Sequence, residues 1–169
     1  MATTATVITV VRTAAGFVLR IAGRGTMKES RAVLAFAERA LAGGGTLALD
    51  LSACDHLDST FLGTLVSLQQ RFGGKEQPPR FALAAPAAGA RKAMGATRLD
   101  AFFTIVDDVP ASDGSAAVPL PVPEKDENPA ATARHIMEAH RRLAELGGPN
   151  QAVFQAIADR CAKELGDQE

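Results

Sequence analysis

Along residues 7–106 the spacing of apolar residues switches repeatedly between a strand pattern and a helix pattern. This feature limits the fold more than any other feature of the sequence. Short runs rich in β-branched and aliphatic residues, typical of strands, alternate with longer stretches in which apolar residues recur every three or four positions, typical of helices. The expected strands are 7–12, 17–21, 46–51 and 80–85, the expected helices are 27–42, 59–72 and 87–97, and a helical turn with an edge strand is expected within 99–106. The order β-β-α-β-α-β-α predicts an α/β fold, a small four- to five-stranded mixed sheet flanked by helices.

Glycines and polar residues separate these elements. The break at 13–16 predicts a hairpin between the first two strands, and three glycines at 43–45 end the first helix. The glycine-rich residues 23–26 are expected to form a flexible loop, and residues 52–59 a polar loop that leads into the second helix.

The last third of the chain has a different organisation. Residues 109–129 have no regular period and hold five of the nine prolines, which predicts a semi-extended linker. Helical periodicity returns at 130–146 and 151–165, on either side of a Gly-Gly-Pro-Asn turn, and predicts a helical hairpin. We therefore expect a domain at 1–108, a linker at 109–129 and a C-terminal hairpin at 130–169. The apolar stripes of this hairpin need cover from each other, from the first domain, or from a second copy in a homo-oligomer.

Composition limits the classes of partner. The 18 Lys and Arg residues are balanced by 19 Asp and Glu residues, so the chain has no overall positive field to hold a nucleic acid. No apolar stretch approaches the roughly 20 residues of a membrane span, so no membrane insertion is expected. The two cysteines are far apart and no signal peptide is apparent, which indicates a cytoplasmic protein with free thiols.

The polar stretch before the second helix carries most of the chemical information. Asp58 and Ser59 stand where a helix begins, and both residue types cap helices well, so either of them can have a purely structural role. Ser59 can also be a phosphoacceptor. A phosphate there would add about −1.5 to −2 charges at a helix N-terminus, with Asp55 and Asp58 opposing it.

Residues 47–65 resemble the STAS domain of bacterial anti-sigma factor antagonists. The resemblance rests on Asp50-Leu-Ser at the end of a strand, on Asp58-Ser59-Thr60 and on the following Leu62-Gly63. The order of elements over residues 5–108 also matches, as does the closing segment at 99–105. One departure is Phe61, which stands where many members have glycine and can either fill the core or alter the partner-binding face.

The resemblance implies a non-enzymatic regulator without a cofactor, in which Ser59 is phosphorylated. In its unphosphorylated form such a protein binds an anti-sigma factor that is also a serine protein kinase. Gly63 would allow close packing of the helix. The residues expected to bind the partner are Gly23, Arg24, Asp55, His56, Asp58, Ser59, Thr60 and Leu62.

Other functions are open from the residues alone. The protein can be a constitutive scaffold, or a subunit of a larger signalling or lipid-transport assembly, in which the hairpin mediates assembly and Ser59 is only a cap. Cys54, His56 and Asp58 alternate but fall short of the four ligands usual for zinc. A Ser59–His56 hydrolase lacks a base that the fold brings in from elsewhere. His135 and His140 are expected on different faces of their helix, in solvent.

Overall fold

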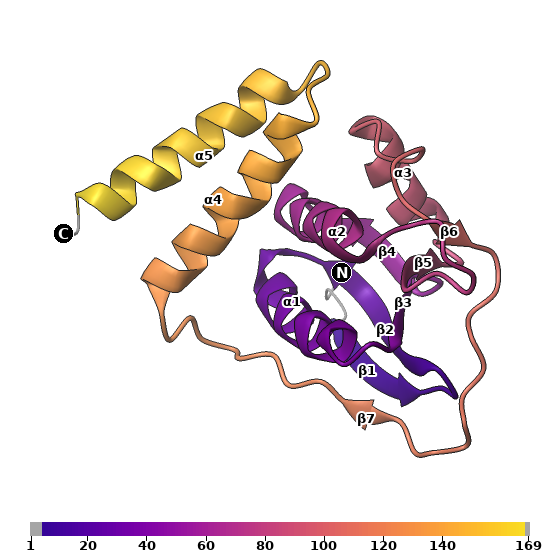
Figure 1. Cartoon of the computed structure of the whole chain (residues 1–169). Coiled ribbons are helices and arrows are strands. Elements are labelled where there is room, and N and C mark those ends of the chain that lie inside the picture. Colours follow the sequence, from indigo (N-terminus) through magenta and orange to yellow (C-terminus); the bar gives the residue numbers. More distant parts are fainter. Residues whose placement is uncertain (1–4, 168–169) are drawn as a thin grey trace.

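The strands pair into one mixed sheet in the computed structural model, which describes residues 5–167 (Figure 1). The strands are β1 Val7–Arg12, β2 Gly16–Gly25, β3 Thr46–Asp50, β4 Cys54–Leu57, β5 Phe81–Ala84, β6 Ile105–Val106 and β7 Val118–Pro119. They lie in the order β6-β5-β3-β2-β1-β7, with β4 pairing to β2 off this path. The β1 contacts to β2 and β7 are antiparallel and the other pairings are parallel. The predicted mixed α/β sheet is confirmed, with two short strands, β4 and β7, in addition to those expected.

The helices begin and end close to the predicted positions. They are α1 Met27–Ala42, α2 Ser59–Phe72, α3 Ala88–Ala96, α4 Pro129–Glu145 and α5 Gln151–Gly166. Thr26 starts α1 through a capping box, in which its side chain accepts from the first turn and the Glu29 carboxylate accepts from the backbone N–H of Thr26. The side chain of Asn128 caps α4. Pro129 follows as the first helical residue, where a backbone N–H would have no partner within the helix in any case.

Two segments that the sequence predicts as loops pair with each other, one as the end of β2 and the other as strand β4. Gly23, Arg24 and Gly25 continue β2 and pair with Cys54, His56 and Leu57 in parallel register. The flexible loop expected at 23–26 is therefore wrong for residues 23–25, and the polar loop expected at 52–59 contains a strand at 54–57. Short length and polar residues hid this pairing, because neither segment has the apolar alternation that marks a half-buried strand.

Strand β7 forms inside the predicted linker. Thr9 and Val10 of β1 pair with Pro119 and Val118, and the backbone N–H of Leu120 donates to the carbonyl of Ile8. Proline has no N–H to give to a ladder, so it is tolerated at such an edge. The linker is thus attached to the sheet at β7 and also near its start, where Thr13 and Ser112 form an isolated bridge and the backbone N–H of Asp113 donates to the carbonyl of Arg12.

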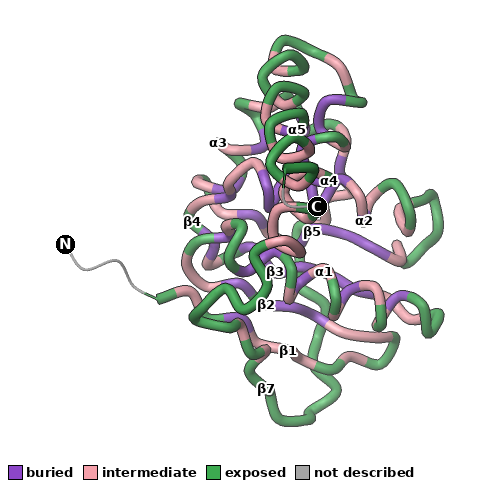
Figure 2. The backbone as a smooth tube through the Cα atoms, turned by 90° about the vertical axis from the view of Figure 1, so that its left-hand side faces the viewer, coloured by how far each residue is buried: buried purple, intermediate pink, exposed green. Residues whose placement is uncertain are grey.

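The main core lies between the sheet and the helices. Alternate residues of β2 and β3, such as Leu19 and Leu49, point toward α1 and α2 and are fully buried, whereas Val18 and Ala48 belong to a smaller cluster on the other face of the sheet. Figure 2 shows the buried segments concentrated in the middle layer, with α5 mostly exposed. Phe61 of α2 is 0% exposed, so it fills the core.

The C-terminal helices form the predicted hairpin and pack on their own chain. Helices α4 and α5 lie against each other, and α4 also lies against α2, with α5 on the outer side of α4 (Figure 1). Leu143 of α4 is buried in the main core, and Phe154 of α5 packs at its edge. The apolar stripes of the hairpin are therefore covered by each other and by the first domain, which are two of the three kinds of cover that the sequence left open.

Candidate functional site

Asp58 joins the N-termini of two helices. Its Oδ1 accepts a hydrogen bond from the backbone N–H of Phe61 at 2.8 Å, and its Oδ2 accepts from the backbone N–H of Met27 at 2.8 Å. One carboxylate therefore caps α2 and also satisfies a free amide at the start of α1, where the positive ends of both helix dipoles favour its charge. Of the two residues that could cap α2, Asp58 is the cap.

Ser59 is the first residue of α2 and contacts a histidine from the far end of the sequence. Its Oγ lies 3.0 Å from Nε2 of His140, and Nδ1 of His140 lies 2.7 Å from the carbonyl oxygen of Ile136. Because a carbonyl only accepts, a neutral His140 carries its hydrogen on Nδ1, and the Ser59 hydroxyl donates to Nε2. Ser59 is half-buried, and His140 is only 3% exposed.

A second histidine of α4 reaches both α1 and α2. Nε2 of His135 lies 2.7 Å from Oγ of Ser30 and 3.3 Å from Oγ1 of Thr64. Both hydroxyls lie within 3.1 Å of backbone carbonyls to which they donate, so the Nε2–H of a neutral His135 donates to the hydroxyl oxygens. The expectation that His135 and His140 lie in solvent is wrong, because α4 sits in a groove between two helices and is contacted on two sides.

Gly63 allows α4 to approach α2 closely. A Cβ atom at this position would lie 2.2 Å from the carbonyl oxygen of Ala139, well inside van der Waals contact. Ala139 itself is small and buried. The close helix packing expected at Gly63 is therefore present, and the neighbouring element is α4.

The remaining predicted partner-binding residues divide into two groups. Arg24 and Asp55 are exposed, and the paired strands β2 and β4 bring Gly23, Arg24 and His56 together at one edge of the sheet. Thr60 and Leu62 are buried, at 4% and 2% exposure, and Leu62 is part of the main core. A partner does not reach Thr60 or Leu62 in this conformation, so the accessible part of the predicted face is the β2–β4 edge, and Ser59 is partly covered by α4.

A family model described as "Mlab, STAS domain" matches residues 8–107. The chain belongs to the STAS domain family. STAS domains are generally non-enzymatic, and the family includes the anti-sigma factor antagonists. The match ends just after β6, so β7, α4 and α5 lie outside it. A comparison with curated protein sequences gave no match.

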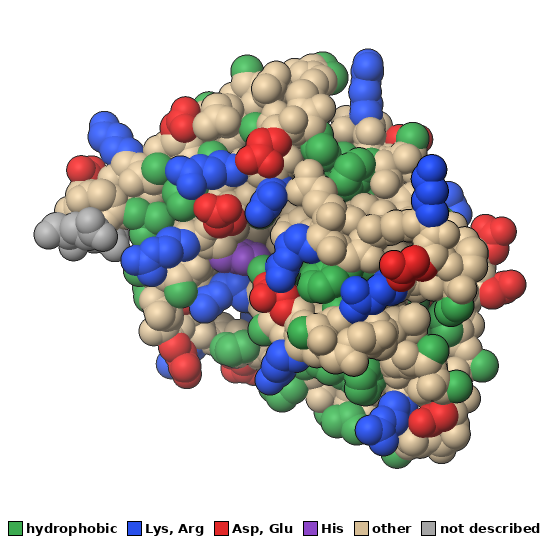
Figure 3. Space-filling view, in the orientation of Figure 1, with side chains coloured by type: hydrophobic (Ala, Val, Ile, Leu, Met, Phe, Trp, Pro, Cys, Tyr) green, Lys and Arg blue, Asp and Glu red, His purple; other side chains and the backbone are tan. Residues whose placement is uncertain are grey.

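The surface of this STAS domain carries mixed charge. Figure 3 shows basic and acidic side chains interspersed over the face that includes α1, and histidine at the seam between α4 and the rest of the molecule. Within residues 5–167, no helix is both long and apolar enough to cross a membrane. The same residues include no group of three or more His, Cys, Asp and Glu side chains that could hold a metal ion. Burial raises the pKa of the Cys54 thiol, which keeps it protonated.

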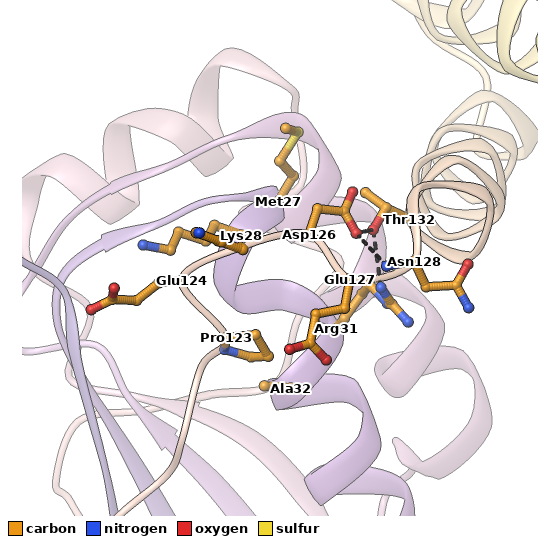
Figure 4. Close-up of a pocket in the computed structure, with 11 residues that line it drawn as sticks. Met27, Lys28, Arg31, Ala32, Pro123, Glu124, Asp126, Glu127, Asn128 and Thr132 are labelled. Carbon is orange, nitrogen blue, oxygen red and sulfur yellow. Dashed lines mark hydrogen bonds between the residues drawn. The ribbon is translucent and has the colours of Figure 1, made fainter.

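A cavity of about 560 Å³ lies between α1 and the linker. Figure 4 shows Arg31 of α1 meeting the linker side of this cavity, where its guanidinium donates to Oγ1 of Thr132 and that hydroxyl donates to Asp126. The charged residues that line the cavity have both signs: Lys28, Arg31, Glu124, Lys125, Asp126 and Glu127. The cavity has no excess of one charge with which to select an ion, and Ser59 is outside its lining.

The docking of α4 is expected to weaken in acid. Burial, together with Arg31 of α1, lowers the pKa of His135 from 6.5 to about 4, while Asp58 beside α2 opposes this effect. Glu138 and Arg142 of α4 line the same small pocket as His135. Because the pKa of His135 is lower when α4 is docked, His135 in the undocked state takes up a proton at a higher pH than in the docked state. The stabilisation is therefore complete above about pH 6.5 and is lost as the pH falls toward 4.

Urea unfolding at pH 7.5 and pH 5 measures this effect. For a partly exposed histidine, this pKa shift corresponds to a loss of about 1–2 kcal/mol in the free energy of unfolding between these two pH values, after allowance for solvent screening. His135→Gln is the control, because its amide can donate to the same hydroxyls but does not titrate. Equal pH dependence in the parent protein and in this variant would contradict the prediction.

Proposed function

We propose that this STAS protein is a cytoplasmic regulator that binds a partner protein through the Ser59 end of α2 and is switched by phosphorylation of Ser59. One observation carries the proposal: the Ser59 hydroxyl lies at a helix N-terminus and makes its side-chain hydrogen bond to a residue outside the STAS domain, His140. Losing that bond breaks no hydrogen bond within the STAS domain itself. The hydroxyl then becomes available to a kinase or a partner.

A phosphate at Ser59 would change the site in two ways. It adds about −1.5 to −2 charges beside Asp58, whose two oxygens already occupy the helix amides. It also replaces a hydroxyl donor with acceptor oxygens, so the bond to Nε2 of a neutral His140 is lost. Both changes alter what a partner meets at the β2–β4 edge. By resemblance to the anti-sigma factor antagonists, the partner is an anti-sigma factor with serine kinase activity, which binds the unphosphorylated form.

Phosphorylation of Ser59 is tested with serine kinases from the same cell. Incubation with ATP is expected to label the full chain at Ser59, as located by mass spectrometry, and Ser59→Ala should abolish that label. Ser52→Ala is the matched control, because Ser52 is an exposed serine of the same segment. Normal labelling of Ser59→Ala would overturn the assignment.

Partner binding is tested with the same proteins immobilised for capture of the labelling kinase. Ser59→Asp should weaken binding by about tenfold or more, since like charges and a lost donor together amount to at least 1.4 kcal/mol. Unchanged affinity would contradict the switch.

A second candidate is a constitutive subunit of a larger assembly, including a lipid-transport assembly. It is favoured by the half-burial of Ser59, which fits a structural hydroxyl. In that case Ser59→Ala and Ser59→Asp would co-purify with the same proteins in the same amounts, and no kinase of the cell would label the chain.

A further inference from the structure

Helix α4 lies in a groove formed by α1 and α2, and it covers the residue on which the proposed switch depends. Its contacts run along the groove from Arg31 and Ser30 of α1 to Ser59 and Gly63 of α2. Helix α5 packs mainly on α4, so the hairpin is held to the domain largely through one helix. We infer that this groove is a helix-binding surface, and that α4 occupies it as an intramolecular competitor of the partner.

The seam between α4 and the domain is rich in polar contacts. His135 bonds to Ser30 and Thr64, and His140 bonds to Ser59. When α4 leaves, each of these groups can bond to water or to a partner instead, so the net cost of each lost bond is small. Leu143 is buried in the core and Ala139 against α2, and they supply the apolar part of the contact. A mixed seam of this kind is typical of interfaces that form and separate.

The shape of the groove restricts what else can bind there. Gly63 lets the backbones of α2 and α4 approach closely, and Ala139 at this crossing is only 4% exposed, so a small residue is favoured there. A competing partner must therefore present an amphipathic helix with Ala, Gly or Ser at the crossing point and hydrogen-bonding side chains one turn before that residue and directly after it, as His135 and His140 do in α4. This part of the inference rests on the proposed function, because that function makes the Ser59 end the partner surface.

The position of the hairpin in the chain agrees with a regulatory addition. The family match ends at residue 107, whereas α4 begins at Pro129. The element that covers Ser59 is thus outside the part of the chain that the family shares. Covering Ser59 also makes its phosphorylation depend on release of α4, since the hydroxyl is half-buried and donates to His140.

The groove is tested in the full chain with Ala139→Leu. Ala139 is buried at the crossing with α2, so a leucine at this position has no free space and should displace α4 without altering the groove itself. Ala156→Leu is the matched control, because Ala156 is an exposed alanine of α5. The probe is a fluorescent peptide of residues 129–146, the chain's own α4. If α4 is docked in at least nine tenths of the parent molecules, the peptide should bind Ala139→Leu about tenfold more tightly than the parent or the control.

A peptide that itself carries Ala139→Leu should fail to bind, which shows that the small residue is required. Equal binding of the normal peptide to the Ala139→Leu protein and to the control would overturn the inference, provided circular dichroism shows both proteins folded. Neither measurement uses a kinase or a partner. The groove can therefore fail while Ser59 is still phosphorylated, and the proposed switch can fail while the groove still takes the peptide.

A second readout follows exposure of the Ser59 position directly. Ser59→Cys is introduced together with Cys161→Ser, so that the buried Cys54 is the other remaining thiol. Alkylation of the new thiol should be about tenfold faster when Ala139→Leu is added and unchanged when Ala156→Leu is added, because the rate follows the undocked fraction. An equal rate in all three proteins would overturn the competition.

Discussion

Replacing Phe61 by alanine is expected to lower the free energy of unfolding by about 3–5 kcal/mol. Phe61 is among the largest fully buried side chains of the protein. Its ring lies against β2, where a Cβ on Gly25 would come within 3.2 Å of the ring and within 2.7 Å of Leu57. The absence of a side chain at Gly25 therefore provides the space that Phe61 fills. Chemical denaturation of the full chain, followed by circular dichroism, measures the loss.

Two further variants make the Phe61 prediction specific. Phe61→Leu keeps most of the apolar volume and should lose markedly less stability than Phe61→Ala. Phe154→Ala removes a half-buried ring at the edge of the core, so its effect should also be smaller. A loss below about 1 kcal/mol for Phe61→Ala would show that the site collapses around the smaller residue and would contradict tight packing of this ring.

Burial of Phe61 decides between the two roles left open for the residue that departs from the family pattern. The ring fills the core and is 0% exposed, so it does not form part of the surface that a partner meets. The departure is matched by Gly25 on the neighbouring strand. We therefore expect Gly25→Ala to destabilise the protein through Phe61 and Leu57, and to leave the chemistry at Ser59 unchanged.

Replacing Asp58 by alanine is expected to cost about 2 kcal/mol, from the lost cap of α2 and the lost partner of the Met27 amide. Asp58→Asn keeps one carbonyl oxygen, which can accept from only one of the two sites, so it should lose about half as much. Urea unfolding gives both values. Asp55→Ala serves as the control, because Asp55 is an exposed acid of the same segment. Equal stability of Asp58→Ala and the control would show that the two helix ends do not depend on this carboxylate.

The sequence predicted the helices well because their ends carry strong local signals. Helix α1 begins after the capping Thr26 and ends at three glycines, and its predicted bounds are those of the structure. Strands β4 and β7 were missed because their pairing partners are distant and their own residues lack an apolar alternation. Local pattern cannot report a strand that is defined mainly by its neighbour.

The site was predicted in part. Asp58 and Ser59 were placed at the start of α2, where they lie, but the residues that cover Ser59 were not expected. His135 and His140 are five positions apart, which separates them by about 140° around a helix. Two residues separated by that angle have different environments, one buried and one exposed, only if the helix has a single buried face. Helix α4 packs between two helices, so both histidines are enclosed, and only tertiary contacts reveal this.

The attachment of β7 to β1 sets how far the hairpin can travel. Nine residues, 120–128, separate β7 from α4, and a fully extended segment of that length reaches about 30 Å. A released hairpin therefore stays near its groove at an effective concentration on the order of millimolar. A partner that takes the groove must outcompete a helix that stays tethered beside it, and when the partner dissociates, α4 returns without a diffusional search. Lengthening this tether would be a way to tune the threshold of the switch without altering any residue that a partner touches.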